Sequence, residues 1–177
     1  ASHVQGGEIT MSCLGGNQYE IKLALYRDCA GINAPGTVSI DYQSVSCGSN
    51  NSVTLNKIPG TGQDVTPICP TETTACNGGT LPGVQEYIYT AIVTLSDCND
   101  WVFSYSINAR NGAISTINSP GSESMYIESE LDNLNFPCNS SPTFTNKPVP
   151  FICVGQQYCF NNGATDIDGD SLSYSMV

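Results

Sequence analysis

Nine cysteines constrain this chain more than any other feature of its 177 residues. They are spread over the whole length, at positions 13, 29, 47, 69, 76, 98, 138, 153 and 159. Together with abundant Gly, Pro, Ser, Thr and Asn, this usage is typical of disulfide-bonded proteins from an oxidising compartment. A zinc site is disfavoured, because no two cysteines have C-x-x-C spacing and His3 is the only histidine. Because nine is odd, at least one cysteine is free, bonded to another chain or paired with a cysteine beyond Val177.

Spacing ranks some of the disulfide pairings. Cys13 and Cys29 flank a predicted hairpin, and Cys29 lies at the far end of its second strand, roughly 30 Å from the turn. A disulfide between these two is therefore disfavoured. Two pairs need only local loop closure and are the disulfide candidates: Cys69 with Cys76, and Cys153 with Cys159.

Apolar and polar residues alternate along much of the chain, and such alternation predicts half-buried β-strands. Strands are expected at residues 8–13, 19–25, 38–42, 52–55, 86–95, 101–107 and 125–131. No segment has convincing helical periodicity. About seven short strands separated by turn signals predict an all-β, antiparallel, Ig-like β-sandwich, with a barrel as the alternative. The long connection at 56–82 needs a brace, for which a local disulfide is the expected source.

The composition changes near Asn133, where Pro, Asn and Ser replace the strand pattern. We expect an N-terminal β-sandwich domain at 1–136. Residues 137–177 are too few for an independent core, so they are expected to be the first strands of a second Ig-like or cadherin-like β-domain, truncated at Val177. The alternative is that they complete the sheet of the first domain.

The net charge of −11, with only five Lys and Arg residues, disfavours nucleic acid and anionic membranes as partners. No apolar run approaches the ~20 residues of a transmembrane segment. The start at Ala-Ser-His suits a mature product whose export signal has been removed, and an engineered start would look the same. These features together predict an exported, extracellular protein.

Two acidic sets are the candidate ion sites. Asp166, Asp168 and Asp170 lie on alternate residues, and three such carboxylates suit calcium. The spacing is not that of an EF-hand, and the alternative is an Asp-Gly turn whose carboxylates cap backbone amides. The second set consists of Glu128, Glu130 and Asp132. It predicts a solvated strand face, or part of a cation site between the domains if the junction folds back.

No catalytic motif is evident, so we expect a protein that is not an enzyme. His3 lacks a nucleophile motif such as G-x-S-x-G, and nothing singles out a glycosidase pair among the 16 acidic residues. Trp101, Tyr87 and Tyr89 are of a type that stacks on sugar rings, but their strand positions favour packing in the core.

Four blocks carry a resemblance, at residues 2–32, 98–114, 123–133 and 139–172. In this order they resemble the N-terminal region of large secreted surface proteins from gliding bacteria, the group of SprB-like gliding-motility adhesins. The resemblance implies an N-terminal module of a very long chain, exported by type IX secretion and held at the cell surface. It also implies that the acidic stretch at 166–170 belongs to a cadherin-like or Ig-like domain in which such acids bind calcium.

The expected function is that of a non-catalytic module of a cell-surface adhesin or filament, involved in surface adhesion and gliding motility. The expected partners are extracellular polysaccharides or proteins and further domains of the same chain. Two alternatives stay open, a carbohydrate-binding or polysaccharide-hydrolase accessory domain and a passive structural spacer.

Overall fold

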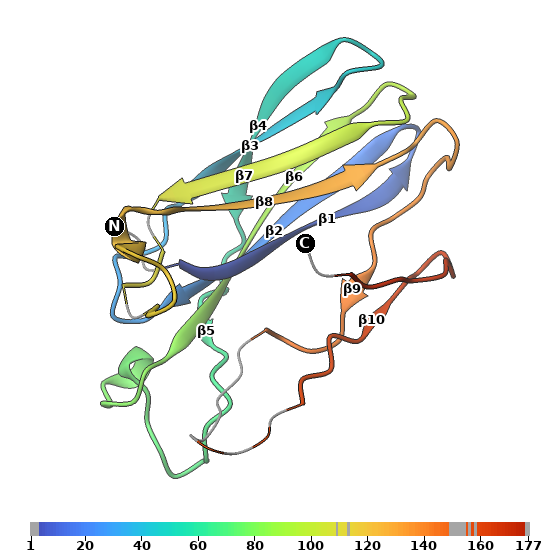
Figure 1. Ribbon diagram of the computed structural model, residues 1–177. Helices are drawn as coiled ribbons and strands as arrows, with labels where there is room; N and C mark the ends of the chain where they lie inside the picture. The colour runs from blue at the N-terminus through green and yellow to red at the C-terminus, as the bar shows by residue number, and fades with distance from the viewer. Residues whose placement is uncertain are drawn as a thin grey trace.

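The structure is a computed structural model that describes residues 4–108, 110–112, 114–148, 155, 157 and 159–175. Nearly all of its regular elements are strands (Figure 1). The strands are β1 (Val4–Gly15), β2 (Gln18–Asp28), β3 (Thr37–Ser44), β4 (Ser49–Lys57), β5 (Gln63–Asp64), β6 (Val84–Thr94), β7 (Trp101–Asn108), β8 (Ser124–Leu131), β9 (Thr143–Phe144) and β10 (Ala164–Thr165). Two short 3-10 helices are η1 (Ala75–Asn77) and η2 (Pro120–Ser122).

One antiparallel sheet dominates the molecule, with the spatial order β1-β2-β6-β4-β3-β7-β8 and with β5 paired to β6. The sheet curls until its end strands, β1 and β8, lie beside each other (Figure 1). A Cβ at Gly7 of β1 would lie 3.2 Å from Ile127 Cδ1 of β8, so the two strands touch there. The prediction of an all-β antiparallel sandwich is confirmed, in a nearly closed, barrel-like form.

The core fills the inside of this curled sheet. On β2 the alternation is clear, since Tyr19, Ile21 and Leu23 are buried while the residues between them are partly exposed. On β7, Trp101 and Phe103 are buried, and Phe103 stacks on Tyr42 with the ring centroids 5.5 Å apart. Trp101 also donates from Nε1 to the Ser96 carbonyl at 3.0 Å, which gives its polar atom a partner inside the core.

Alternation fails at the end of β2, where Tyr26 and Arg27 are buried as well. Tyr26 forms a small second cluster with Val84 and Val65, because the β4–β6 connection folds over this part of the sheet. Arg27 donates to the carbonyls of Gly31 and Ile32 and to the Gln85 side chain. These acceptors compensate for the burial of its charge and hold the chain that leaves β2.

Three disulfides cross-link the described residues: Cys13–Cys138, Cys29–Cys76 and Cys47–Cys98. The disfavoured pairing of Cys13 with Cys29 is indeed not formed. A disulfide stabilises a protein by lowering the conformational entropy of its unfolded chain. In this account, closed loops of 47, 51 and 125 residues each contribute about 4–5 kcal/mol to stability. The three contributions do not simply add, because the loops overlap in the sequence.

The predicted pairing of Cys69 with Cys76 is wrong. The Cys29 amide donates to the Gly83 carbonyl at 2.9 Å, and this contact brings the end of β2 to η1. The Cα atoms of Cys29 and Cys76 are 4.9 Å apart, a normal disulfide distance. Position 83 must be glycine for this approach, since a Cβ there would lie 2.5 Å from Cys76 Sγ. Cys69 keeps an exposed free thiol, so the long-range pair has displaced the local one.

The second candidate pair, Cys153 with Cys159, stays a prediction. Cys159 carries an exposed free thiol in the structure, whereas Cys153 lies outside the described residues.

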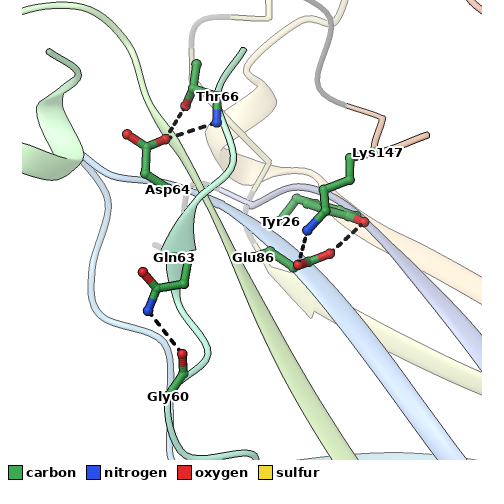
Figure 2. A network of polar contacts seen from close by, with 7 residues as sticks. All are labelled: Tyr26, Gly60, Gln63, Asp64, Thr66, Glu86 and Lys147. Atoms are coloured by element: carbon green, nitrogen blue, oxygen red, sulfur yellow. Dashed lines mark hydrogen bonds and ion pairs between the residues drawn. The ribbon is translucent and has the colours of Figure 1, made fainter. Parts of the chain in front are cut away.

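A hydrogen-bond network adds a second brace to the long connection between β4 and β6. Asp64 accepts hydrogen bonds from the Thr66 amide at 3.0 Å and the Thr66 hydroxyl at 2.5 Å (Figure 2). It also accepts from the Thr74 hydroxyl and from Asn77 Nδ2. Burial alone would raise the pKa of Asp64, but the hydrogen bonds from Thr66 and Thr74 outweigh burial and lower it. The ionised carboxylate therefore organises this loop.

Candidate ligand-binding cleft

A cleft of about 750 Å³ lies where β1 and β8 face each other, and residues after Phe136 form its third wall. This volume is within the usual range of ligand-binding sites, roughly 300–1,000 Å³. Its lining residues are Gly7, Glu8, Ile9, Thr10, Tyr126, Ile127, Glu128, Ser129, Glu130, Leu131, Asp132, Phe136, Asn139, Ser140, Ser141, Pro142, Phe144, Asp166, Asp170 and Leu172.

The third wall of the cleft is fixed to β1 by a disulfide and by hydrogen bonds. Cys138 is bonded to Cys13, and the Cα atoms are 5.1 Å apart. Ser141 donates its amide to the Met11 carbonyl at 2.7 Å and accepts from the Met11 amide through Oγ at 3.0 Å. Ser140 Oγ accepts from the Cys13 amide at 3.2 Å. The wall is thus attached to the side of β1 that faces away from β2, by one backbone hydrogen bond and by two bonds to serine hydroxyls.

A second attachment joins the C-terminal segment to the sheet farther along. Lys147 forms an ion pair with Glu86 of β6, and the other oxygen of Glu86 accepts from the Tyr26 hydroxyl at 3.2 Å (Figure 2). Burial is the main cause of the raised pKa of Tyr26, and the charges of Glu8 and Glu86 add to it. Tyr26 is therefore a neutral hydrogen-bond donor to Glu86 at physiological pH.

The cleft is strongly acidic. Six carboxylates line it, and the lining set contains no Lys, Arg or His. They are Glu8, Glu128, Glu130, Asp132, Asp166 and Asp170. The structure thus brings the second predicted acidic set to the same cleft as two members of the first. This follows from the fold-back of the junction at residues 137–142.

Hydrogen bonds and burial act on several of the groups that line the cleft. Glu128 accepts from the Tyr126 hydroxyl at 2.6 Å, and this bond raises the pKa of Tyr126. Asp132 accepts from the Asn135 side chain at 2.7 Å and from the Asn135 amide at 2.8 Å, and both bonds lower its pKa. Burial raises the pKa of Glu8, with partial compensation from Lys22. Glu8 is not among the site residues predicted from the sequence, because it occupies an ordinary polar position of a predicted half-buried strand.

The candidate calcium residues are partly engaged with the backbone. Asp166 Oδ1 accepts from the amides of Asp168 at 2.8 Å and of Asp170 at 3.2 Å. Asp168 Oδ2 accepts from the Ser140 amide at 2.7 Å. Two of the three carboxylates thus cap backbone amides, as the alternative interpretation has it, while Asp170 faces the cleft. Within the described ranges no group of three Asp, Glu, His or Cys residues is arranged to hold a metal ion, and calcium binding stays a prediction.

Apolar side chains supply the rest of the cleft. Ile9 and Leu131 are buried at its base. Phe136 and Phe144 are 62% and 50% exposed, and Tyr126 is exposed as well. The aromatic residues singled out in the sequence lie elsewhere, since Trp101 and Tyr89 are 2% and 0% exposed in the core, and Tyr87 is partly buried and packs against the core. The cleft aromatics come from a loop and two strands that carry no shared pattern, so the sequence offers no signal for them.

Among the residues described, no helix is long and apolar enough to cross a membrane. Three disulfides are typical of proteins that fold in an oxidising compartment. No protein-family model, curated protein or solved structure matches this chain. The resemblance to gliding-bacteria surface proteins, the Ig-like assignment and the division at residue 136 therefore remain hypotheses.

Proposed function

We propose that this chain is a non-catalytic extracellular binding module of a larger cell-surface protein and that it binds its partner in the cleft between β1 and β8. The observation that carries this proposal is the cleft itself, which combines an apolar base, exposed aromatics and six carboxylates. Apolar surface that stays exposed beside polar groups marks interaction sites.

The disulfides support the extracellular part of the proposal. Cys13–Cys138 joins two walls of the cleft directly. A site whose walls are cross-linked loses less conformational entropy when a ligand binds. Such preorganisation suits a module that holds a partner under the changing conditions outside a cell.

The role in adhesion and gliding motility is proposed on the resemblance of the four sequence blocks.

A carbohydrate partner is the second candidate. Phe136, Phe144 and Tyr126 are exposed aromatics beside carboxylates, and this combination provides stacking faces and hydrogen-bond acceptors for sugar rings. It differs from the core aromatics Trp101 and Tyr89, which have no exposed face to offer.

The test is binding of the purified, oxidised chain to intact bacteria and to immobilised polysaccharides. The informative variant is Glu8→Gln with Glu130→Gln, which removes one charge from each strand wall without changing side-chain size. Its matched control is Glu72→Gln with Glu123→Gln, two exposed acids outside the cleft. Loss of binding in the cleft variant alone supports the proposal. Absence of binding by the unaltered chain contradicts it and favours the passive spacer.

A further inference from the structure

We propose that the Cys13–Cys138 disulfide is a redox-sensitive latch of the cleft. A dithiol reductant cleaves this bond before the two other disulfides of the described residues, and the third wall of the cleft then separates from β1. Four features carry this proposal: the access to one sulfur, the environment of the other, the backbone at Cys138 and the weakness of the other contacts that hold the wall.

The first feature is the access to Cys138. This residue is exposed, and its partner Cys13 is partly exposed. Thiol–disulfide exchange begins when a thiolate reaches one sulfur of the bond, so access helps to decide which bond reacts first. In the Cys29–Cys76 disulfide both residues are only partly exposed. The backbone of Gly83 packs closely against Cys76 Sγ, since a Cβ there would lie 2.5 Å from the sulfur. Cys138 is therefore the more open point of attack.

The second feature is the environment of Cys13, which leaves as a thiolate when Cys138 is attacked. The Gly15 amide donates to Cys13 Sγ at 3.3 Å, and this bond strengthens as negative charge develops on the sulfur. The Cys47–Cys98 disulfide differs. Cys47 is exposed, but attack there expels Cys98, which is 1% exposed and belongs to the core. A thiolate that forms in an apolar site is poorly solvated and is a poor leaving group.

The third feature is the backbone of Cys138, whose φ of 61° lies in the left-handed region. This region favours glycine, because the Cβ of other residues crowds the backbone there. Such a conformation persists where the surrounding structure imposes it. The bond to Cys13 is part of that constraint. Cleavage therefore allows residue 138 to leave this conformation, and the change opposes closure of the latch.

The fourth feature is the weakness of the other contacts between the wall and the sheet. The hydrogen bonds of the wall to β1 come from Ser140 and Ser141. Farther along the chain, Lys147 pairs with Glu86, but the lysine side chain is 49% exposed, and exposed ion pairs contribute little to stability. Without the disulfide, these contacts have to offset the conformational entropy that the freed segment gains.

The dithiol supplies everything that the reaction needs. One thiolate of the reductant attacks Cys138 Sγ, the bond to Cys13 Sγ breaks, and Cys13 leaves as a thiolate that takes a proton from water. The second thiolate of the reductant then attacks the reductant sulfur of the mixed disulfide and expels Cys138, which is protonated in turn. Two electrons thus pass to the protein, which ends with two thiols, and the reductant ends as a cyclic disulfide.

The first test is limited reduction of the oxidised protein with dithiothreitol. Free thiols are blocked beforehand with N-ethylmaleimide. Thiols that form during the reduction are labelled with iodoacetamide and located by peptide mass spectrometry. We expect label at Cys13 and Cys138 to appear about tenfold faster than at the cysteines of the two other disulfides. Equal or faster reduction of either of those disulfides overturns the proposal.

The second test is hydrogen exchange of the amide at position 141, which donates to the Met11 carbonyl in the oxidised protein. After limited reduction this amide should exchange about tenfold faster or more, because the wall opens locally. The amides of Ile21 and Ala91, in the β2–β6 ladder, should keep their protection. An unchanged rate at position 141 shows that the wall stays on β1 without the disulfide, and it overturns the latch. Neither test uses a ligand, so both are separate from the binding function proposed above.

Two variants distinguish the disulfide from the hydrogen bonds of the same wall. In Cys13→Ala with Cys138→Ala the bond is absent, so position 141 should exchange fast with or without dithiothreitol. Ser140→Ala with Ser141→Ala is the matched control, since it removes the hydroxyl acceptors and keeps the disulfide. It should keep position 141 protected until it is reduced. Protection in the cysteine variant, or its loss in the oxidised serine variant, contradicts the latch. If the cysteine variant does not fold, limited reduction of the unaltered protein decides.

Discussion

The amide of Ser141 donates a hydrogen bond to the carbonyl of Met11 at 2.7 Å, across 130 positions of sequence. This bond and its neighbour, from the Met11 amide to Ser141 Oγ, attach the C-terminal segment to β1. The disulfide Cys13–Cys138 lies next to them. The third wall of the cleft is therefore fixed to β1 by a covalent bond and by hydrogen bonds.

The first prediction concerns this disulfide. Cys13→Ser with Cys138→Ser should destabilise the protein by up to about 4–5 kcal/mol, because it frees the longest cross-linked loop of the unfolded chain. The measurement is the free energy of unfolding in guanidinium chloride. Cys69→Ser is the control, since Cys69 has an exposed free thiol, and it should leave the midpoint unchanged. A double variant as stable as the control would show that the bond does not form.

Sequence alternation predicted the strands well, because period-2 burial is a local property. Residues 19–25 and 101–107 lie within β2 and β7 with the expected faces buried. The disulfide pairings, in contrast, could not be predicted from the sequence. Cys29 meets Cys76 only because the long connection folds back over the end of β2, and nothing in the local spacing encodes that return.

The cleft could be predicted only in part. Glu130 and Asp170 belong to the two acidic sets that the sequence shows, but their shared location depends on the fold-back after Phe136. Glu8 was missed because it lies 120 or more positions from these sets in the chain, on a strand whose partners the sequence does not specify. In a curled sheet the first and last strands meet only when all the strand pairings between them have formed. Their proximity therefore depends on the whole fold and not on any local stretch of sequence.

The second prediction is an acid sensitivity centred on Asp64. Its hydrogen bonds lower the pKa below the ordinary 3.8 in the folded protein. A carboxylate with a lowered folded pKa stabilises the protein above its unfolded pKa, and this stabilisation is lost as the pH falls through the folded value. Asp64→Asn should therefore reduce stability at neutral pH and make the loss of stability below about pH 4 shallower. The measurement is the melting temperature against pH. Parallel curves for both proteins would contradict the assigned role.

The third prediction concerns Glu8 and has the opposite sign. Burial raises its pKa above the ordinary 4.5, although Lys22 offsets part of the effect. An acid with a raised folded pKa favours the folded state below its unfolded pKa, and that contribution is lost as the pH rises through the folded value. Glu8→Gln should therefore raise the melting temperature at pH 7 and have little effect below the ordinary pKa of 4.5. A lower melting temperature at pH 7 would indicate that the ionised form of Glu8 is stabilised by contacts stronger than its burial.

The fourth prediction tests calcium. If Asp166, Asp168 and Asp170 bind the ion, calcium at a hundredfold its dissociation constant adds about 2.7 kcal/mol to stability, and a chelator should lower the melting temperature by several degrees. Asp168→Asn should remove this response while its amide oxygen still accepts from the Ser140 amide. Asp41→Asn, at an exposed position of β3, is the control and should respond as the unaltered protein does. Identical melting curves with calcium and with chelator would contradict calcium binding. They would indicate that these carboxylates only cap backbone amides of the turn at Gly169, where Asp166 accepts hydrogen bonds from two amides.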